Sequence, residues 1–426
     1  METIAPYLER PEFLAVIGPR QAGKTTLLEM LRNHLVEKHG IPFEMTGFVT
    51  FENRKHLVQF ESDPVSFVRS FVPGERTGTF YLMIDEFQYA ENGGQKLKLV
   101  YDTQKQIKVI VTGSSSLEIA ATGRHMTGRM LYFMLYQFGF SEFLKTRDNR
   151  LHEIYLENNR KILELLLKDR RPEFENGCDL FRDEFITRFE EYSVFGGYPA
   201  VVLADTDDIR AKILEDIFNG YIMKDVKGLL ELATDRNLLL LAKLLATQTG
   251  NIVVYKNLGQ AASLDSRNLK KHLSLLEQTF IVREVKPFFR NRQSELCKNP
   301  KYYFIDQGFR NCLLGNFSTP DQRTDAGVLV ENTVFTRLNN LLGSMERLNF
   351  WRTKAGAEVD FVISRGEKII PVEVKYSDFK SPQITRSLSS FIDTFSPGIA
   401  CVLTKNFIGS MKRNGTAVFF FPVYYL

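Results

Sequence analysis

The sequence is short of cysteine, tryptophan and net charge, and these shortages exclude several classes of protein. The four cysteines, Cys178, Cys297, Cys312 and Cys401, include no C-x-x-C pair, so neither a cysteine zinc site nor a disulfide framework is expected. Tryptophan occurs once, at Trp351. The net charge of +4 among 55 basic and 51 acidic side chains neither requires nor excludes nucleic acid, because a local basic patch matters more than the total.

Long apolar runs are also missing. None approaches the roughly 20 residues that a membrane-spanning helix needs, and residues 1–13 carry three acids instead of the apolar region of a signal peptide. We therefore expect no membrane partner and a cytoplasmic location. The 426 residues, 44% hydrophobic and 25% charged, are typical of a soluble globular protein, and the length predicts about three domains.

A phosphate-binding loop follows the first apolar run. Residues Phe13–Ile17 predict a strand, and GPRQAGKTT comes directly after it, ahead of a helical pattern that stops at Gly40. This strand, loop and helix is the context that G-x-x-x-x-G-K-[ST] requires. The residues expected to bind the nucleotide are Gly18, Pro19, Arg20, Gln21, Ala22, Gly23, Lys24, Thr25 and Thr26.

The loop chemistry predicts ATP with Mg²⁺. Backbone N–H groups and the positive end of the following helix attract phosphate. Lys24 is expected to reach the β- and γ-phosphates, and the Thr25 hydroxyl to coordinate Mg²⁺.

Two later strand ends supply the other catalytic groups. Phe80–Ile84 predicts a strand that ends in Asp85, placed to hold Mg²⁺, and Glu86, placed to activate the attacking water. One strand candidate, Phe43–Phe51, lies between the loop and this acidic pair. Ile107–Thr112 predicts a further strand followed by Ser114, which could sense the γ-phosphate or belong to a helix N-cap.

Two Gly-Arg pairs precede an aromatic segment, Met130–Phe140, that reads as a strand. Arg124 or Arg129 could serve as an arginine finger for its own or a neighbouring subunit. A solvated surface arginine is the alternative reading.

These residues, in this order, resemble a family of archaeal and bacterial AAA+-like ATPases with a C-terminal domain of unknown function. The matching segments are FLAVIGPRQAGKTTLL, FYLMIDEFQ, VTGSSSLEI and TGRMLYFMLYQFGFSEFL, with FGGYPAVV, NGYIMKDV and the stretch from Thr247 to Leu314 farther along. The resemblance implies ATP binding and favours Arg129 over Arg124.

The middle of the chain reads as a helical linker followed by a winged helix. LHEIYLENNRKILELLLKDRRPEF predicts an amphipathic helix broken at Pro172, either a lid or a packing helix. A second helix is expected from Asp265 or Ser266 to Thr279, with its leucines buried. Its exposed side chains would be Arg267, Lys270, Lys271 and His272, and the hairpin that follows carries Arg290, Arg292, Lys298 and Lys301. Such a basic helix and wing suit DNA, although a protein–protein role is the alternative.

The last quarter changes character. GVLVENTVFTRLNNLL predicts a helix bearing Glu331, and three strands follow, with Asp360 on the second and Glu373 and Lys375 on the third. Residues two apart on a strand share a face, so Glu373 and Lys375 converge, and antiparallel pairing brings Asp360 beside them. Two carboxylates with a divalent ion, Mg²⁺ or Mn²⁺, and a lysine can activate water against a phosphodiester.

This arrangement resembles the PD-(D/E)xK nuclease superfamily, with Glu331 completing the metal shell. The alternative is a retained fold that binds without cleaving. We therefore expect an α/β protein of four segments: a P-loop ATPase over 1–145, a helical linker over 146–234, a winged helix over 235–316 and a nuclease-like domain over 317–426.

The expected function is an ATPase coupled to metal-dependent DNA handling, including possible endonucleolytic cleavage, with DNA and a homo-oligomer as partners. The competing expectation is an ATP-gated switch that binds nucleic acid or protein and cleaves nothing.

Overall fold

The structure is a computed structural model that describes residues 3–74, 78–114, 125–168, 170–171, 179–221, 235–290, 295, 298–343 and 345–426. Of the residues named above, Arg124, Pro172, Cys178, Arg292 and Cys297 lie outside the described residues. The chain divides into two compact units, one of residues 1–137 with 278–280 and one of residues 138–277 with 281–426. The expected division into four domains stays a prediction.

The first unit is built on a five-stranded sheet in the order β2-β3-β4-β1-β5, and every neighbouring pair is parallel. Its strands are β1 Phe13–Ile17, β2 Thr46–Thr50, β3 Phe80–Asp85, β4 Ile107–Gly113 and β5 Met130–Met134. Its helices are α1 Lys24–His39, α2 Arg54–Ser62, α3 Pro64–Arg69 and α4 Gly93–Thr103, with 3₁₀ turns η1 Ala5–Tyr7, η2 Phe43–Met45 and η3 Phe87–Tyr89.

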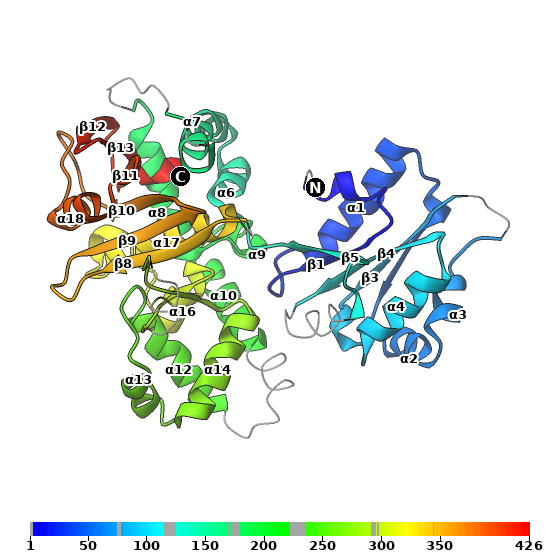
Figure 1. Ribbon diagram of the computed structural model, residues 1–426. Coiled ribbons are helices and arrows are strands. Elements are labelled where there is room, and N and C mark those ends of the chain that lie inside the picture. The colour runs from blue at the N-terminus through cyan, green and yellow to red at the C-terminus, as the bar shows by residue number, and fades with distance from the viewer. Residues whose placement is uncertain are drawn as a thin grey trace. The chain divides into compact units, whose positions relative to one another are not determined.

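Helices cover both faces of this sheet, as Figure 1 shows for α1 on one side and α2 to α4 on the other. Alternate residues of one strand therefore enter different cores. Leu14 and Val16 pack with the α1 leucines, whereas Phe13 and Ala15 pack with Phe60 and other side chains of the opposite layer. Because both faces of the sheet are covered, every residue of β1, β3 and β4 is buried, and most of these residues are apolar.

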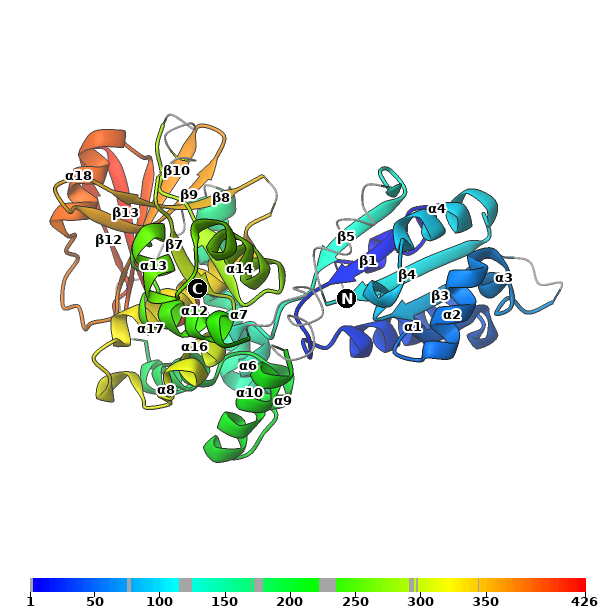
Figure 2. The same ribbon diagram turned by 90° about the horizontal axis from the view of Figure 1, so that it is seen from below.

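The second unit combines helices with a six-stranded sheet of order β12-β13-β11-β10-β9-β8 and a two-stranded sheet of β6 and β7 (Figure 2). Its strands are β6 Val282–Val285, β7 Lys301–Phe304, β8 Arg347–Arg352, β9 Glu358–Arg365, β10 Lys368–Lys375, β11 Ile399–Thr404, β12 Gly409–Arg413 and β13 Thr416–Pro422. Its helices are α6 Phe140–Arg147, α7 Asn149–Lys168, α8 Arg182–Phe195, α9 Pro199–Val202, α10 Asp207–Tyr221, α12 Asp235–Thr247, α13 Tyr255–Ala261, α14 Ser266–Gln278, α16 Gln307–Leu314, α17 Ala326–Leu341 and α18 Arg386–Phe395, with 3₁₀ turns η5 Pro320–Gln322 and η6 Val423–Tyr425.

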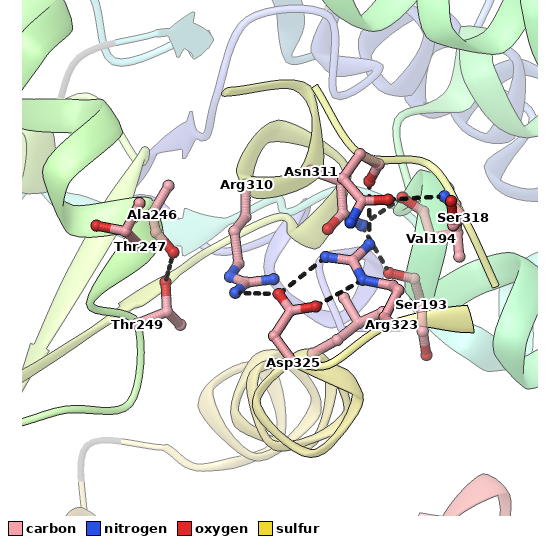
Figure 3. Close-up of polar contacts among 12 residues, drawn as sticks. Ser193, Val194, Ala246, Thr247, Thr249, Arg310, Asn311, Ser318, Arg323 and Asp325 are labelled. Carbon is pink, nitrogen blue, oxygen red and sulfur yellow. Dashed lines mark hydrogen bonds and ion pairs between the residues drawn. The ribbon is translucent and has the colours of Figure 1, made fainter. Parts of the chain in front are cut away.

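A buried charge cluster fixes the start of α17. The Asp325 carboxylate accepts hydrogen bonds from Arg310 of α16 at 2.7 Å and from Arg323 at 2.8 and 3.0 Å. Figure 3 shows the carboxylate between the two guanidinium groups, with Asn311 bonded to the carbonyl oxygens of Ser193 and Val194 nearby. Both arginines are buried, so this cluster ties α16 to the helix that carries Glu331.

Two expectations about secondary structure and burial were wrong. The aromatic strand ends at Met134 and not at Phe140, because its partner β1 ends at Ile17 and the last bond between them runs from Leu135 N to Ile17 O. His272 is 1% exposed because it shares the buried face of α14 with the leucines, and its ring contacts Asn268 O at 2.7 Å.

Within the described residues, no helix has the length and apolar character needed to cross a bilayer.

Candidate functional site

The loop after β1 requires glycine at both ends. A Cβ added at Gly18 would lie 1.9 Å from Leu135 O, a distance that no side chain allows. Gly23 has φ +93 and caps α1, a conformation that glycine adopts without strain. Thr25 and Thr26 then lie in the first turn of α1, where backbone N–H groups lack helical acceptors and face outward as anion ligands.

Lys24 is folded onto the loop that precedes it. Its Nζ donates to Gly18 O at 3.1 Å and to Pro19 O at 2.8 Å, and the residue is 4% exposed. The ammonium group is therefore held at the mouth of the loop, beside the site where phosphate would enter.

Thr25 and Asp85, both expected to hold Mg²⁺, lie side by side at the carboxyl edge of the sheet. The Thr25 hydroxyl donates to Asp85 Oδ2 at 2.7 Å. The other carboxylate oxygen accepts from the Thr112 hydroxyl of β4. A hydroxyl and a carboxylate together are oxygen ligands suited to Mg²⁺.

Glu86 follows Asp85 in a left-handed conformation, with φ +54, which turns its side chain away from the line of β3. Burial raises the pKa of the Glu86 carboxyl, and the nearby Lys24 ammonium opposes that rise. Gln88 donates to Glu86 Oε2 and, at 3.1 Å, to the buried Ser114 hydroxyl. One amide thus joins the acidic pair after β3 to the serine after β4.

Arg20 and Arg129 differ in position. Arg20, in the loop, donates to Tyr89 OH at 3.2 Å and lies close enough to Glu86 to oppose, with Lys24, the rise that burial causes in the pKa of that carboxyl. Arg129 precedes β5, at the amino edge of the sheet, and its Nε lies 3.1 Å from Asp102 Oδ1. The P-loop lies at the carboxyl edge, so the structure does not bring Arg129 to the loop of its own chain.

A second cluster of titratable groups lies in the second unit, on β9 and β10. Val372 pairs with Phe361, so Glu373 lies opposite Asp360 one step beyond. Asp360 Oδ2 accepts from Val374 N at 2.7 Å, and Lys375 Nζ lies 3.2 Å from Glu373 Oε1. The three side chains predicted to converge are therefore neighbours.

Burial dominates the electrostatics of this cluster. It raises the pKa of Asp360, to which Glu358 adds, and it raises the pKa of Glu373, to which Asp360 adds. Burial alone would lower the pKa of Lys375, but Glu373 and Asp360 reverse that effect and raise it. Thr385, the N-cap of α18, donates to both oxygens of Glu373, at 2.9 and 3.0 Å.

Burial raises the pKa of the Glu331 carboxyl, Lys301 opposes that rise and the nearby Asp360 adds to it, but the contacts of Glu331 are made with other residues. It accepts a hydrogen bond from Tyr303 OH and lies 3.5 Å from Lys301 Nζ. Lys301, 1% exposed, also pairs with Glu358 at 2.5 Å. A buried ammonium group thus occupies the space between Glu331 and Glu358, and within the described ranges no three histidine, cysteine or acidic side chains form a group that could hold a metal ion.

The structure adds Gln88, Thr112 and Lys301 to the residues found from sequence. Gln88 had a local signal, because it follows the acidic pair by two residues in FYLMIDEFQ. Thr112 lies near the end of β4, and from sequence a hydroxyl there could equally belong to a helix N-cap. Lys301 was expected on an exposed basic wing and is instead buried.

Comparisons with known proteins agree with the geometry of the loop. Residues 10–144 match the family model of a AAA domain, and residues 186–319 and 326–422 match two domains of unknown function, DUF8612 and DUF4143. An uncharacterized protein of Haemophilus influenzae is 23% identical over 90% of this chain and 88% of its own length. One from Methanocaldococcus jannaschii is 23% identical over 85% and 74%.

Among solved structures, the Walker-type ATPase of Pyrococcus abyssi is 14% identical with a TM-score of 0.46, covering 74% of this chain and 94% of its own. The Aeropyrum pernix ORC1 protein in complex with DNA is 13% identical with a TM-score of 0.31, covering 74% and 90%. The AAA match covers the parallel sheet, the loop and the acidic pair. The N-terminal part of this chain is therefore similar to a AAA domain and carries a P-loop.

Proposed function

We propose that the first unit binds ATP with Mg²⁺ and hydrolyses it. The observation that carries the proposal is the meeting of Thr25 and Asp85 at 2.7 Å, with Lys24 and Glu86 beside them. These are the groups that position a nucleotide, hold its metal ion and activate a water molecule.

Each residue has a distinct part in this proposal. Lys24 exchanges its loop carbonyl acceptors for phosphate oxygens, and Thr25 and Asp85 would hold Mg²⁺, which neutralises charge on the phosphates. Glu86 accepts a proton from the attacking water, a task favoured by its raised pKa. Ser114, bonded to Gln88, is placed to contact the γ-phosphate.

Nucleotide binding tests the first step. Lys24→Ala should lose tight binding of a fluorescent ATP analogue in the presence of Mg²⁺. Lys98→Ala, an exposed lysine of α4, should bind as the unmodified protein does. Equal affinity in all three proteins would contradict the role of the loop.

For the second unit we propose metal-dependent DNA handling on a winged-helix and nuclease-like framework. Two features support it. Helices α13 and α14 precede the β6–β7 hairpin, with Arg267, Lys270 and Lys271 exposed on α14. Asp360, Glu373 and Lys375 lie together on adjacent strands, and two carboxylates would hold one divalent ion while the lysine stabilises charge on a phosphate.

The competing function is an ATP-gated switch that binds DNA or protein without cleaving. It is favoured by Lys301, which engages Glu331 and so leaves Asp360 and Glu373 as the carboxylates available to an ion. Incubation of plasmid DNA with Mg²⁺ or Mn²⁺, with and without ATP, separates the two. Cleavage lost in Lys375→Ala supports the nuclease function, and intact plasmid under every condition supports the switch.

A further inference from the structure

A large cleft opens in the second unit at the end of the sheet where β9 turns into β10. Its volume is about 1100 Å³, above the range of roughly 300–1,000 Å³ common for small-molecule pockets. Its walls come from the carboxyl end of α7, the segment after β6, the start of β8, the β9–β10 turn and the segment after α18. The cleft is therefore large enough to hold a segment of a polymer and not only a small molecule.

The charges around the cleft are mainly positive. Its walls carry five basic side chains against two acids, Glu346 and Glu367; the basic ones are Lys168, Arg290, Arg347, Arg365 and Lys368. The excess of three positive charges compares with +4 for the whole chain. The lining of the cleft is thus more basic than the surface of the chain as a whole.

Acidic side chains pair with three of these basic groups at the surface. Glu346 accepts from Arg365 Nε at 2.7 Å, Arg347 lies 3.4 Å from Glu295, and Lys168 lies 3.9 Å from Glu164. Ion pairs exposed to solvent are weak, so an anionic ligand can compete for these cations. Lys168, Arg290 and Lys368 are exposed to solvent. They are therefore accessible to an anionic ligand.

Between the charges lie apolar and aromatic side chains. Phe289 and Phe395 are half-buried and line the cleft, together with Ile369 and Ile370. The Arg290 guanidinium lies 5.5 Å from the centre of the Phe395 ring. Alternating cations and partly open rings are the combination that binds single strands, because phosphates meet the cations and unpaired bases stack on the rings.

We propose that this cleft binds single-stranded nucleic acid. A duplex keeps its base faces stacked inside and presents only phosphates, so it would leave the aromatic surface unused. An acidic peptide would satisfy the cations but would bring no π faces to Phe289.

The cleft is separate from the sites already described. It lies at the Lys368 end of β10, whereas Lys375 ends that strand seven residues and about 23 Å farther along. Neither Glu373 nor Lys375 lines the cleft. The exposed basic residues of α14 do not line it. Binding in the cleft requires neither ATP turnover nor a metal ion, so it goes beyond the function proposed above.

The test is fluorescence anisotropy of a labelled oligothymidylate with the full-length protein, in EDTA and without nucleotide. Cleavage and ATP hydrolysis then contribute nothing. In the triple variant Lys168→Gln/Arg290→Gln/Lys368→Gln, the slope of log K against log salt should shrink by about 2, because each phosphate contact on a single strand contributes about 0.7. Phe289→Ala should weaken binding by about 5- to 100-fold through lost stacking.

Matched variants make the result decisive. Lys354→Gln/Lys380→Gln/Lys412→Gln removes three exposed lysines of the second unit outside the cleft and should leave affinity and slope unchanged. Thermal melts establish that each variant is folded. The proposal is overturned by no binding of the oligonucleotide, by equal competition from duplex or polyglutamate, or by a loss that follows Arg267, Lys270 and Lys271 on α14 and not the cleft residues.

Discussion

Gln88 joins the two side chains that would face a bound γ-phosphate, Glu86 and Ser114. Replacing it with alanine leaves both in place but removes the amide that orients them. Loss of such a supporting group typically costs about 10- to 100-fold in activity. We expect Gln88→Ala to lower kcat for ATP hydrolysis by that factor with little change in KM.

The matched control is Gln95→Ala, an exposed glutamine on α4, which should behave as the unmodified enzyme does. A rise in KM of about 10- to 100-fold in Gln88→Ala, with kcat unchanged, would show that Gln88 acts in binding and not in orienting Glu86.

Lys301 contributes to stability because its ammonium group is buried between two carboxylates. Replacing it with methionine keeps the volume but leaves Glu331 and Glu358 without their shared cation, which we expect to cost about 3 kcal/mol of unfolding free energy. Urea unfolding followed by the fluorescence of Trp351, which is in β8 of the same unit, measures this. Lys298→Met, on the exposed segment before β7, should unfold at an unchanged urea concentration, and equal midpoints for both variants would contradict the argument.

At the scale of elements, α17 depends on the cluster at its start. Hydrogen bonds from Arg323 and then Arg310 lower the pKa of Asp325, so the folded state favours the ionised carboxylate. The resulting stability is present above about pH 4, the ordinary pKa of aspartate, and is lost as the pH falls through the lowered value. Asp325→Asn should therefore destabilise the protein at pH 7 by about 3 kcal/mol, because two buried guanidinium groups lose their counter-ion.

The difference between this variant and the unmodified protein should shrink as the pH falls below about 4, because protonation removes the same charge. Urea titrations between pH 7 and pH 3 measure it, with the exposed Asp321→Asn as the control. A difference that stays constant down to pH 3 would show that the cluster acts through shape and not through charge.

A helix or strand could be predicted from the sequence where neighbouring residues alone determine it. The strands before the loop and the acidic pair, and the helix that begins at Ser266 after Asp265, follow from runs of neighbouring residues. Asp265 indeed accepts from Arg267 N and Asn268 N.

Contacts between distant segments were the part that sequence could not supply. Gln88 and Ser114 are 26 residues apart, and Lys301 meets Glu358 across 57. Nothing in the pattern around Lys301 distinguishes a lysine buried among carboxylates from one on an exposed wing, because the partners come from other elements. The same reasoning applies to Glu331, whose helix was predicted but whose contacts with Tyr303 and Lys301 were not.

At the scale of the whole molecule, Arg129 raises the question of assembly. It precedes β5 at the sheet edge opposite the loop, and the five residues of that strand span about 17 Å. An arginine-finger role for Arg129 therefore requires a neighbouring copy of the chain. We expect the specific ATPase rate to rise with protein concentration, and Arg129→Ala to lower it by about 10³-fold or more while nucleotide binding persists.

A rate independent of protein concentration, together with a fully active Arg129→Ala variant, would leave Arg129 as a surface residue paired with Asp102. The matched control is Arg69→Ala, at an exposed arginine of the first unit, and it should not change the rate.

The central claim, that the first unit hydrolyses ATP through Glu86, is tested most directly by phosphate release from Mg²⁺-ATP. Glu86→Gln keeps the shape of the side chain and its contact with Gln88 but cannot accept a proton from water. We predict that this variant binds ATP as tightly as the unmodified protein and releases phosphate at least about 100-fold more slowly. Equal rates of phosphate release by the two proteins would contradict the claim.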